Sequence, residues 1–155
     1  NRLNRLVKNP KHYVVDPALT AAAVRLDAPG VLRDSDVLGR LLDTFVAAQL
    51  RPLVPLAESA PRLYHLREVG AGREIDLLLE FGGRGVVAIE VKAASAPRRT
   101  DARHLEWLRD QLGERFIGGV VLHTGLVVTD LAPGIHALPI SSFWSAPERS
   151  TRRMV

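Results

Sequence analysis

Two apolar strand patterns on either side of a glycine-rich turn constrain this 155-residue chain more than any other stretch. The first runs from Glu74 to Phe81 and the second from Gly85 to Lys92, and both are rich in aliphatic and β-branched residues. Gly82-Gly83-Arg84 between them predicts a hairpin turn. An Asp, a Glu and a Lys lie within these apolar runs, where charges are costly unless they are paired or used.

The length of the turn decides which charged side chains face each other. If residues 82–84 form a three-residue loop, Phe81 pairs with Gly85. Asp76 then lies directly opposite Glu90, with the two Cβ atoms about 5 Å apart. A two-residue turn would shift the register by one and place the two carboxylates on opposite faces of the sheet.

Two carboxylates this close repel each other unless a cation or a proton lies between them. One arrangement that fits is a divalent ion, Mg²⁺ or Mn²⁺, held by Asp76, Glu90 and the backbone carbonyl of Val91. Lys92 shares a face with Glu90 and would orient a metal-bound water or stabilise charge on a phosphate. The alternative for Asp76, Glu90 and Lys92 is a structural salt-bridge cluster at the end of the sheet. The alternative for Glu74 is a simple ion pair with Lys92 across the hairpin.

Asp76 followed by Glu90-Val91-Lys92 resembles the D…(D/E)-x-K signature of the PD-(D/E)XK nuclease superfamily. Flanking stretches resemble one branch of it, the uncharacterised C-terminal domain of prokaryotic AAA-family ATPases, and occur in that branch's order. These stretches are Lys11-His12-Tyr13-Val14-Val15-Asp16-Pro17-Ala18-Leu19, Gly39-Arg40-Leu41-Leu42-Asp43-Thr44-Phe45-Val46, Leu122-His123-Thr124-Gly125 and Ile135-His136-Ala137-Leu138-Pro139-Ile140.

The resemblance implies a restriction-endonuclease-like fold with an αβββαβ core and metal-dependent phosphodiester hydrolysis on nucleic acid. Asp76, Glu90, Lys92 and Asp43 would then be the catalytic residues, although Ile75 stands where the superfamily has Pro and Asp43 where this branch usually has Glu. The resemblance also implies an N-terminal ATPase domain on the same polypeptide as partner. The alternative is a catalytically inactive nuclease-fold module that binds DNA or protein for that ATPase.

Composition is ordinary for a soluble globular domain and is compatible with a nucleic-acid partner. The net charge of +4 and isoelectric point near 10.1 come from Arg far more than Lys, and Arg suits bidentate phosphate contacts. Arg98, Arg99 and Arg103 follow the site along the chain and are the candidate nucleic-acid contacts; the alternative is a solvated loop. The chain has no Cys, no signal-peptide pattern and no apolar run of membrane-spanning length, so we expect a cytoplasmic protein without a membrane partner.

The order of predicted elements indicates a single α/β domain, with a mixed central sheet flanked by helices. Residues 1–10 are expected to be a basic linker, residues 11–144 the domain and residues 145–155 a flexible basic tail. Three helices are expected. The first covers residues 18–25 and is broken at residues 27–30; the second is capped by Asp34-Ser35-Asp36 and ended by Pro52 and Pro55; the third covers residues 102–115. Besides the hairpin, the expected strands are 13–15, 62–68, 118–123, 126–129 and 135–140.

Three histidines lie near these predicted elements without the spacing of metal ligands. His65, His104 and His123 are therefore expected to be surface residues or histidines satisfied by neighbouring groups.

Overall fold

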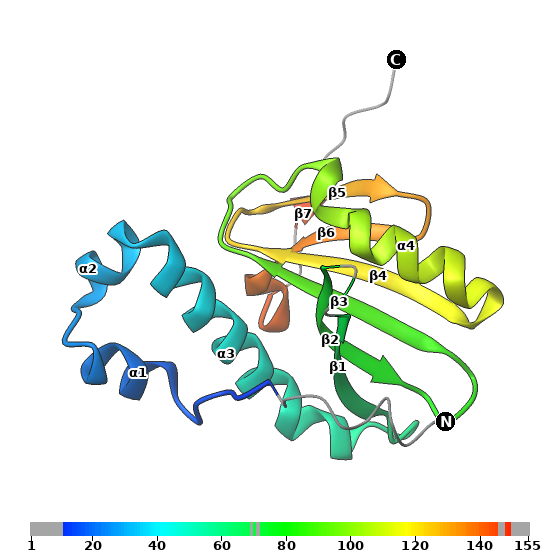
Figure 1. Ribbon diagram of the computed structural model, residues 1–155, viewed down its shortest axis with the longest axis horizontal. Coiled ribbons are helices and arrows are strands. Elements are labelled where there is room, and N and C mark those ends of the chain that lie inside the picture. Colours follow the sequence, from blue (N-terminus) through cyan, green and yellow to red (C-terminus); the bar gives the residue numbers. More distant parts are fainter. Residues whose placement is uncertain (1–10, 69, 71, 146–147, 150–155) are drawn as a thin grey trace.

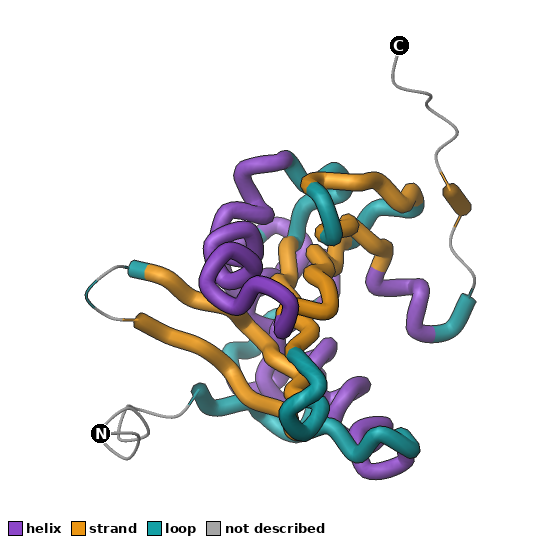
Figure 2. The backbone as a smooth tube through the Cα atoms, turned by 90° about the vertical axis from the view of Figure 1, so that its right-hand side faces the viewer, coloured by secondary structure: helices purple, strands orange, loops and turns teal. Residues whose placement is uncertain are grey.

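A computed structural model describes residues 11–68, 70, 72–145 and 148–149, so the predicted linker and most of the predicted tail lie outside the described part. The described residues form one α/β domain in which helices lie on both faces of a mixed sheet (Figure 1). α3 covers one face and α4 the other, and Figure 2 shows the same layering from the side. The predicted fold class is thus confirmed.

Three of the four α-helices of the described chain begin after an Asp whose side chain caps them. α1 (Pro17–Ala23) and α2 (Ala28–Arg33) follow Asp16 and Asp27, whose carboxylates accept hydrogen bonds from Ala18 and Gly30 backbone N–H groups. α3 (Ser35–Leu53) follows Asp34, which accepts from the N–H groups of Asp36 and Val37. α4 (Arg103–Leu112) continues the 3₁₀ turn η3 (Arg99–Ala102), and η2 (Val54–Leu56), η4 (Gly113–Arg115) and η5 (Ile140–Phe143) are further 3₁₀ turns.

The sheet runs in the order β1-β2-β3-β4-β6-β5, with a two-residue β7 beside β5. The strands are β1 (Arg62–Glu68), β2 (Arg73–Glu80), β3 (Val86–Lys92), β4 (Phe116–His123), β5 (Val127–Ala132), β6 (Ile135–Pro139) and β7 (Glu148–Arg149). β1, β2 and β3 form an antiparallel meander, whereas β3, β4 and β6 are parallel. α4 connects β3 to β4, as a parallel pair requires, so the predicted helix, three strands, helix, strand order is observed.

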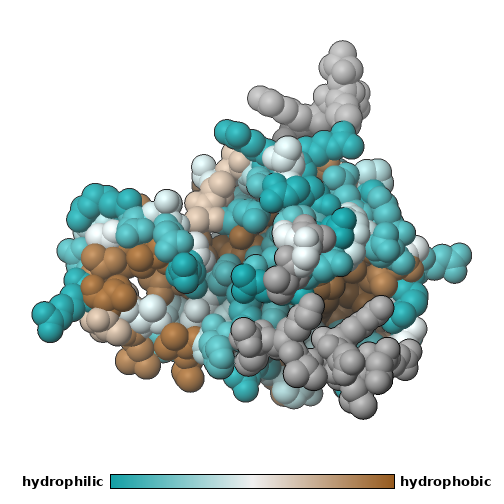
Figure 3. Space-filling view, viewed as in Figure 1, coloured by the Kyte–Doolittle hydropathy of each residue, from teal (hydrophilic) through white to brown (hydrophobic). Residues whose placement is uncertain are grey.

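The core is divided by the sheet into two apolar clusters. Val46 of α3 packs with Leu77, Ile89, Val91 and Leu122 on one face. Leu105 and Leu108 of α4 pack on the other face, with Ile75, Ala88, Ala102, Val121 and Ile135. Apolar side chains that the described core leaves exposed gather over α1 and α2, at the left of Figure 3, and include Leu19, Val24 and Leu32.

Three local predictions differ from the structure. Residues 13–15 form no strand, because Tyr13 turns its hydroxyl to the Asp76 carbonyl instead of pairing along a sheet edge. Residues 27–30 start α2 rather than breaking a helix, since Pro29 occupies the first turn, where proline is tolerated. The helix predicted over 102–115 ends at Leu112, because Gly113 has a φ of 54°.

Candidate functional site

The hairpin between β2 and β3 has the predicted three-residue loop. Phe81 N–H donates to the Gly85 carbonyl at 2.9 Å, and the ladder continues with Leu77 opposite Ile89. One step further along this register, Asp76 falls opposite Glu90. The Asp76 carboxylate accepts the N–H of Val91, the residue after Glu90, and both carboxyl groups line the same cleft, so the predicted juxtaposition of Asp76 and Glu90 is present.

A β-bulge in β2 sets the direction of the Asp76 side chain. Tyr64 pairs with Leu78 but Leu66 pairs with Ile75, so β2 contains one more residue than β1 across this interval. Ile75 and Leu77 consequently pack on opposite faces of the sheet, although residues two apart normally share a face. The bulge turns the Asp76 carboxylate into the space beside β3, where its Oδ2 accepts the Val91 N–H at 2.9 Å.

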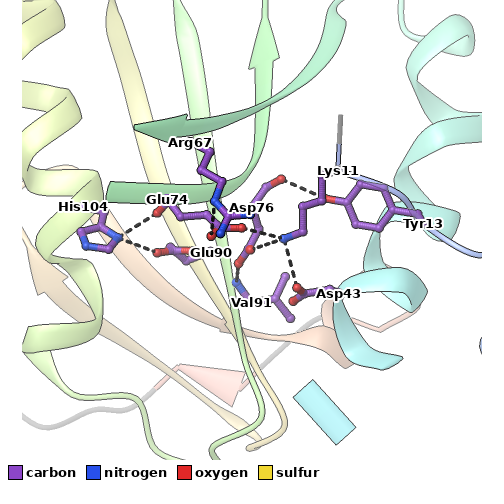
Figure 4. A network of polar contacts seen from close by, with 9 residues as sticks. All are labelled: Lys11, Tyr13, Asp43, Arg67, Glu74, Asp76, Glu90, Val91 and His104. Atoms are coloured by element: carbon purple, nitrogen blue, oxygen red, sulfur yellow. Dashed lines mark hydrogen bonds and ion pairs between the residues drawn. The ribbon is translucent and has the colours of Figure 1, made fainter. Parts of the chain in front are cut away.

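The Lys11 ammonium lies inside the carboxylate cluster (Figure 4). Its Nζ is 2.6 Å from Asp76 Oδ1, 3.1 Å from Asp43 Oδ2 and 3.6 Å from Glu74 Oε1. Tyr13 follows on the same segment, and its hydroxyl donates to the Asp76 carbonyl at 3.0 Å. Burial alone would lower the pKa of Lys11, but the carboxylates of Asp76 and Asp43 outweigh burial and raise the pKa above its ordinary value.

His104 of α4 closes the other side of the cluster. Its Nδ1 lies 2.8 Å from the Glu74 carbonyl and 3.5 Å from Glu90 Oε1, and its Nε2 accepts from Arg103 Nε at 3.1 Å. The partner of Nδ1 is a carbonyl oxygen, which accepts, and the partner of Nε2 is an N–H group, which donates. Both contacts fit the neutral tautomer that carries its proton on Nδ1. The imidazole therefore joins α4 to both strands of the hairpin.

The buried carboxyl groups titrate away from their ordinary ranges. Burial and the hydrogen bond and negative charge of Asp76 raise the pKa of Glu90 to about 9. Burial also acts to raise the pKa of Asp76, but hydrogen bonds from Glu90, Lys11 and the Val91 N–H outweigh it and lower that pKa. Burial and the charge of Asp76 raise the pKa of Asp43. At neutral pH Glu90 thus carries the proton that the pair shares.

Lys92 lies near this cluster without replacing Lys11. Its charge partly offsets the upward pKa shifts of Asp43 and Glu90, which places it close to both carboxyls. Glu74 pairs with Lys11 and, at 3.8 Å, with Arg67, so the alternative Glu74–Lys92 ion pair is wrong. The bulge is the reason, because it ends the β2–β3 ladder before Glu74.

A cleft of about 750 Å³ opens over these residues, between α3 and the sheet. Asp43, Asp76, Glu90, Val91 and Lys92, the predicted catalytic and metal-binding residues, all line it. The three predicted arginine contacts, Arg98, Arg99 and Arg103, are exposed where η3 and α4 begin and do not line the cleft. Arg103 is joined to it through its hydrogen bond to His104, which does line the cleft.

The carboxylates do not fit a divalent cation in this conformation. Such a cation needs ionised carboxylate oxygens with free lone pairs. Here Asp76 accepts hydrogen bonds at both oxygens, Glu90 is protonated at neutral pH, and the Lys11 ammonium takes the place of a cation. Within the described ranges, no group of three or more His, Asp or Glu side chains is arranged to hold a metal ion. The metal role of Asp76, Glu90 and Val91 stays a prediction.

Two residues of the site, Lys11 and His104, were not among the predicted site residues. Lys11 and His104 enter the cluster from segments far from the hairpin, and their only sequence signal was the position of Lys11 in a stretch that resembles a family motif. His123, at the end of β4, is 1% exposed; its Nδ1 accepts from the Gly125 N–H, and burial lowers its pKa. Of the two predicted alternatives, the surface position is wrong for His123, and the satisfied histidine holds at Nδ1 only, because its buried Nε2 has no hydrogen-bond partner among the described residues.

Fold and cleft together define a single α/β domain with a buried, charge-neutralised carboxylate cluster at the carboxyl end of β3. A family model described as "Domain of unknown function (DUF4143)" matches residues 38–143. The chain belongs to this family, and the match includes every predicted site residue while Lys11 lies outside it. No curated protein and no solved structure matches the chain. Among the described helices, none has the length and apolar character needed to cross a membrane.

Proposed function

We propose that this domain is a nucleic-acid-binding module that grips the phosphate backbone of DNA through Arg98, Arg99 and Arg103. The observation that carries the proposal is that these exposed positive charges have few acidic side chains paired with them in the described part of the chain. Among described contacts, their one ion pair joins Arg99 Nη2 to Glu106 Oε1 at 3.9 Å, and the Arg99 side chain is 78% exposed. Phosphates would supply the anions that the domain itself does not.

The position of these arginines on α4 supports the same proposal. The start of a helix carries a partial positive charge, so cations placed there lower helix stability. Arg99 lies in the 3₁₀ turn that leads into α4, and Arg103 is the first residue of α4. Exposed backbone N–H groups at a helix start attract phosphates as well. Three arginines at this point therefore favour binding an anion over stabilising the helix.

The carboxylate cluster supports binding that needs no metal. Its negative charge is already offset by Lys11 and Lys92, and Glu90 is neutral at pH 7. The cleft therefore does not repel a polyanion as four ionised carboxylates would. The sequence resemblance supports an ATPase domain on the same polypeptide, in the cytoplasm, as the partner that this module would deliver to DNA.

The test is fluorescence anisotropy with a short labelled DNA duplex in EDTA, over a series of salt concentrations. We expect the double variant Arg98→Ala/Arg103→Ala to bind about tenfold or more weakly and to reduce the slope of log affinity against log salt by about 2. The matched control is Arg84→Ala/Arg115→Ala, which removes the same charge at the opposite end of β3, beside the Val86–Phe116 pair.

Equal losses in both double variants would contradict a located site, and affinity that does not change with salt would contradict phosphate contacts. In either case a protein partner becomes the better explanation for the exposed arginines.

Metal-dependent phosphodiester hydrolysis is a second candidate function, which the contact between Asp76 and Glu90 favours. Asp43 and Lys92 line the same cleft as Asp76 and Glu90 and would assist the hydrolysis. The same duplex, incubated with Mn²⁺, tests this candidate: cleavage by the wild type that Glu90→Gln abolishes would support it. Cleavage that persists unchanged in this variant would assign the activity to another site or to a contaminant.

A further inference from the structure

Lys11 holds carboxylates from two different elements at once. Asp43 comes from α3, whereas Glu74 and Asp76 come from β2, and all three lie within 3.6 Å of the same Nζ. The Lys11 side chain is 19% exposed, so this charge is largely withdrawn from water. Without the ammonium, the half-buried Asp43 and the buried Asp76 carboxylates would repel each other, because they are close together and incompletely solvated.

A divalent cation and this ammonium compete for the same oxygens. Mg²⁺ and Mn²⁺ bind carboxylates at about 2.0–2.2 Å, and the Lys11 Nζ already lies 2.6 Å from Asp76 Oδ1. A metal at that oxygen would lie within a few ångströms of a fixed positive charge in a poorly solvated cleft, where repulsion is weakly screened. The two cations therefore exclude each other.

The segment that carries Lys11 is held to the described domain by two side chains, Lys11 and Tyr13. Residues 11–15 form no helix or strand, and Val14 and Val15 are 45% and 87% exposed. The polar contacts that tie this segment to the described domain are those of Lys11 and the Tyr13 hydroxyl, and Tyr13 also packs against the apolar cluster under α3. Past Asp16 the chain enters α1, which has its own N-cap and packs against α3, so its contacts do not depend on those of Lys11.

We propose that Lys11 is a built-in cation that keeps divalent metal out of the Asp43–Asp76 carboxylate pair, and that metal enters only when residues 11–15 leave the cleft. The N-terminal segment is then a strap that determines whether this site is closed or metal-competent. The inference goes beyond DNA binding by the arginines and holds whether or not that binding occurs.

The first experiment is calorimetric titration of Mn²⁺ into the folded protein. We expect Lys11→Met and Lys11→Gln to bind Mn²⁺ about tenfold or more tightly than the wild type, because each removes the competing charge and keeps a side chain of similar length. The control Lys11→Arg keeps the charge and is expected to bind like the wild type. Adding Asp76→Asn to Lys11→Met is expected to abolish binding.

A second measurement uses the wild type, so that it decides even if the Lys11 variants fail to fold. Trypsin cleaves after an accessible lysine, and the ion pairs of Lys11 protect it. We expect millimolar Mn²⁺ to accelerate cleavage between Lys11 and His12, with cleavage after the exposed Arg84 unchanged as internal reference. The inference is overturned if folded variants without the ammonium bind Mn²⁺ no more tightly than the wild type, or if Mn²⁺ leaves cleavage after Lys11 unchanged.

Discussion

At the scale of single residues, the site depends on one carboxyl group that stays protonated. Glu90 is 4% exposed and lies between Asp76 and His104, which favours its neutral form. Asp76, by contrast, is ionised, since it has an ammonium and a backbone N–H as donors. Two chemically similar carboxyl groups thus carry different charges because their donors differ.

The raised pKa of Glu90 predicts how stability changes with pH. Folding raises this pKa from 4.5 to about 9, so the contribution of Glu90 to stability is full below pH 4.5 and is lost as pH rises towards 9. Gln stays uncharged at every pH. We therefore expect the free energy of unfolding of Glu90→Gln to rise relative to the wild type by about 1 kcal/mol or more between pH 5 and pH 9.

Urea denaturation at several pH values measures this difference. The control is Glu114→Gln at an exposed position of η4, for which the difference from the wild type should stay constant. A wild type that gains stability over Glu90→Gln as pH rises would show that Glu90 is ionised in the folded state.

At the scale of elements, β3 is fixed at its two ends by different means. Its carboxyl end meets the bulge in β2, whereas its start follows Gly85 in a tight turn. Gly85 has a φ of 151°, and an added Cβ would lie 2.6 Å from Ile117 Cγ1 and 2.8 Å from the Arg115 carbonyl. The start of β3 thus packs too closely against β4 for any side chain.

Two glycine-to-alanine substitutions should therefore have opposite effects. Gly85→Ala is expected to lower the free energy of unfolding by about 2 kcal/mol or more, because the backbone at Arg115 cannot move aside. Gly39→Ala, within α3, meets no atom within 4 Å and is expected to raise it by about 0.5–1 kcal/mol. Chemical denaturation checks both, and a stable Gly85→Ala protein would contradict the observed turn.

At the scale of the whole molecule, the sheet separates two apolar clusters that nevertheless belong to one cooperative unit. Leu77 lies in the cluster under α3 and Leu105 in the cluster under α4, and they are 2% and 0% exposed. The central strands contribute side chains to both clusters, since alternate residues point to opposite faces. Loss of packing on one face should therefore weaken the other.

Leu77→Ala and Leu105→Ala are each expected to lower the free energy of unfolding by about 2–5 kcal/mol within a single transition. Circular dichroism reports the helices, and Trp107 fluorescence, measured in a Trp144→Phe background, reports the α4 side, because the second tryptophan lies against Phe45 of α3. The two signals should coincide. Leu126→Ala, at a position 76% exposed, is the control and should change stability by less than about 0.5 kcal/mol. Separate transitions for the two signals would show two independently folding halves.

The sequence predicted most of the fold because its signals are local. β1 has the predicted bounds 62–68, and β2, β3 and α3 differ by only a few residues from prediction. The errors at residues 13–15 and 27–30 have tertiary and positional causes: Tyr13 binds a distant carbonyl, and Pro29 begins a helix. Short segments such as these carry too few residues for periodicity to decide their structure.

By itself the sequence determined the hairpin and its register, because the loop of residues 82–84 and the alternation of apolar side chains act over a few residues. It thereby brought Asp76 and Glu90 together. Tertiary structure alone decided what neutralises them. Lys11 is 65 residues from Asp76 in the chain, and His104 reaches Glu74 across 30. The partner of a buried charge is the group that the tertiary fold places beside it, and a local sequence pattern does not specify which group that is.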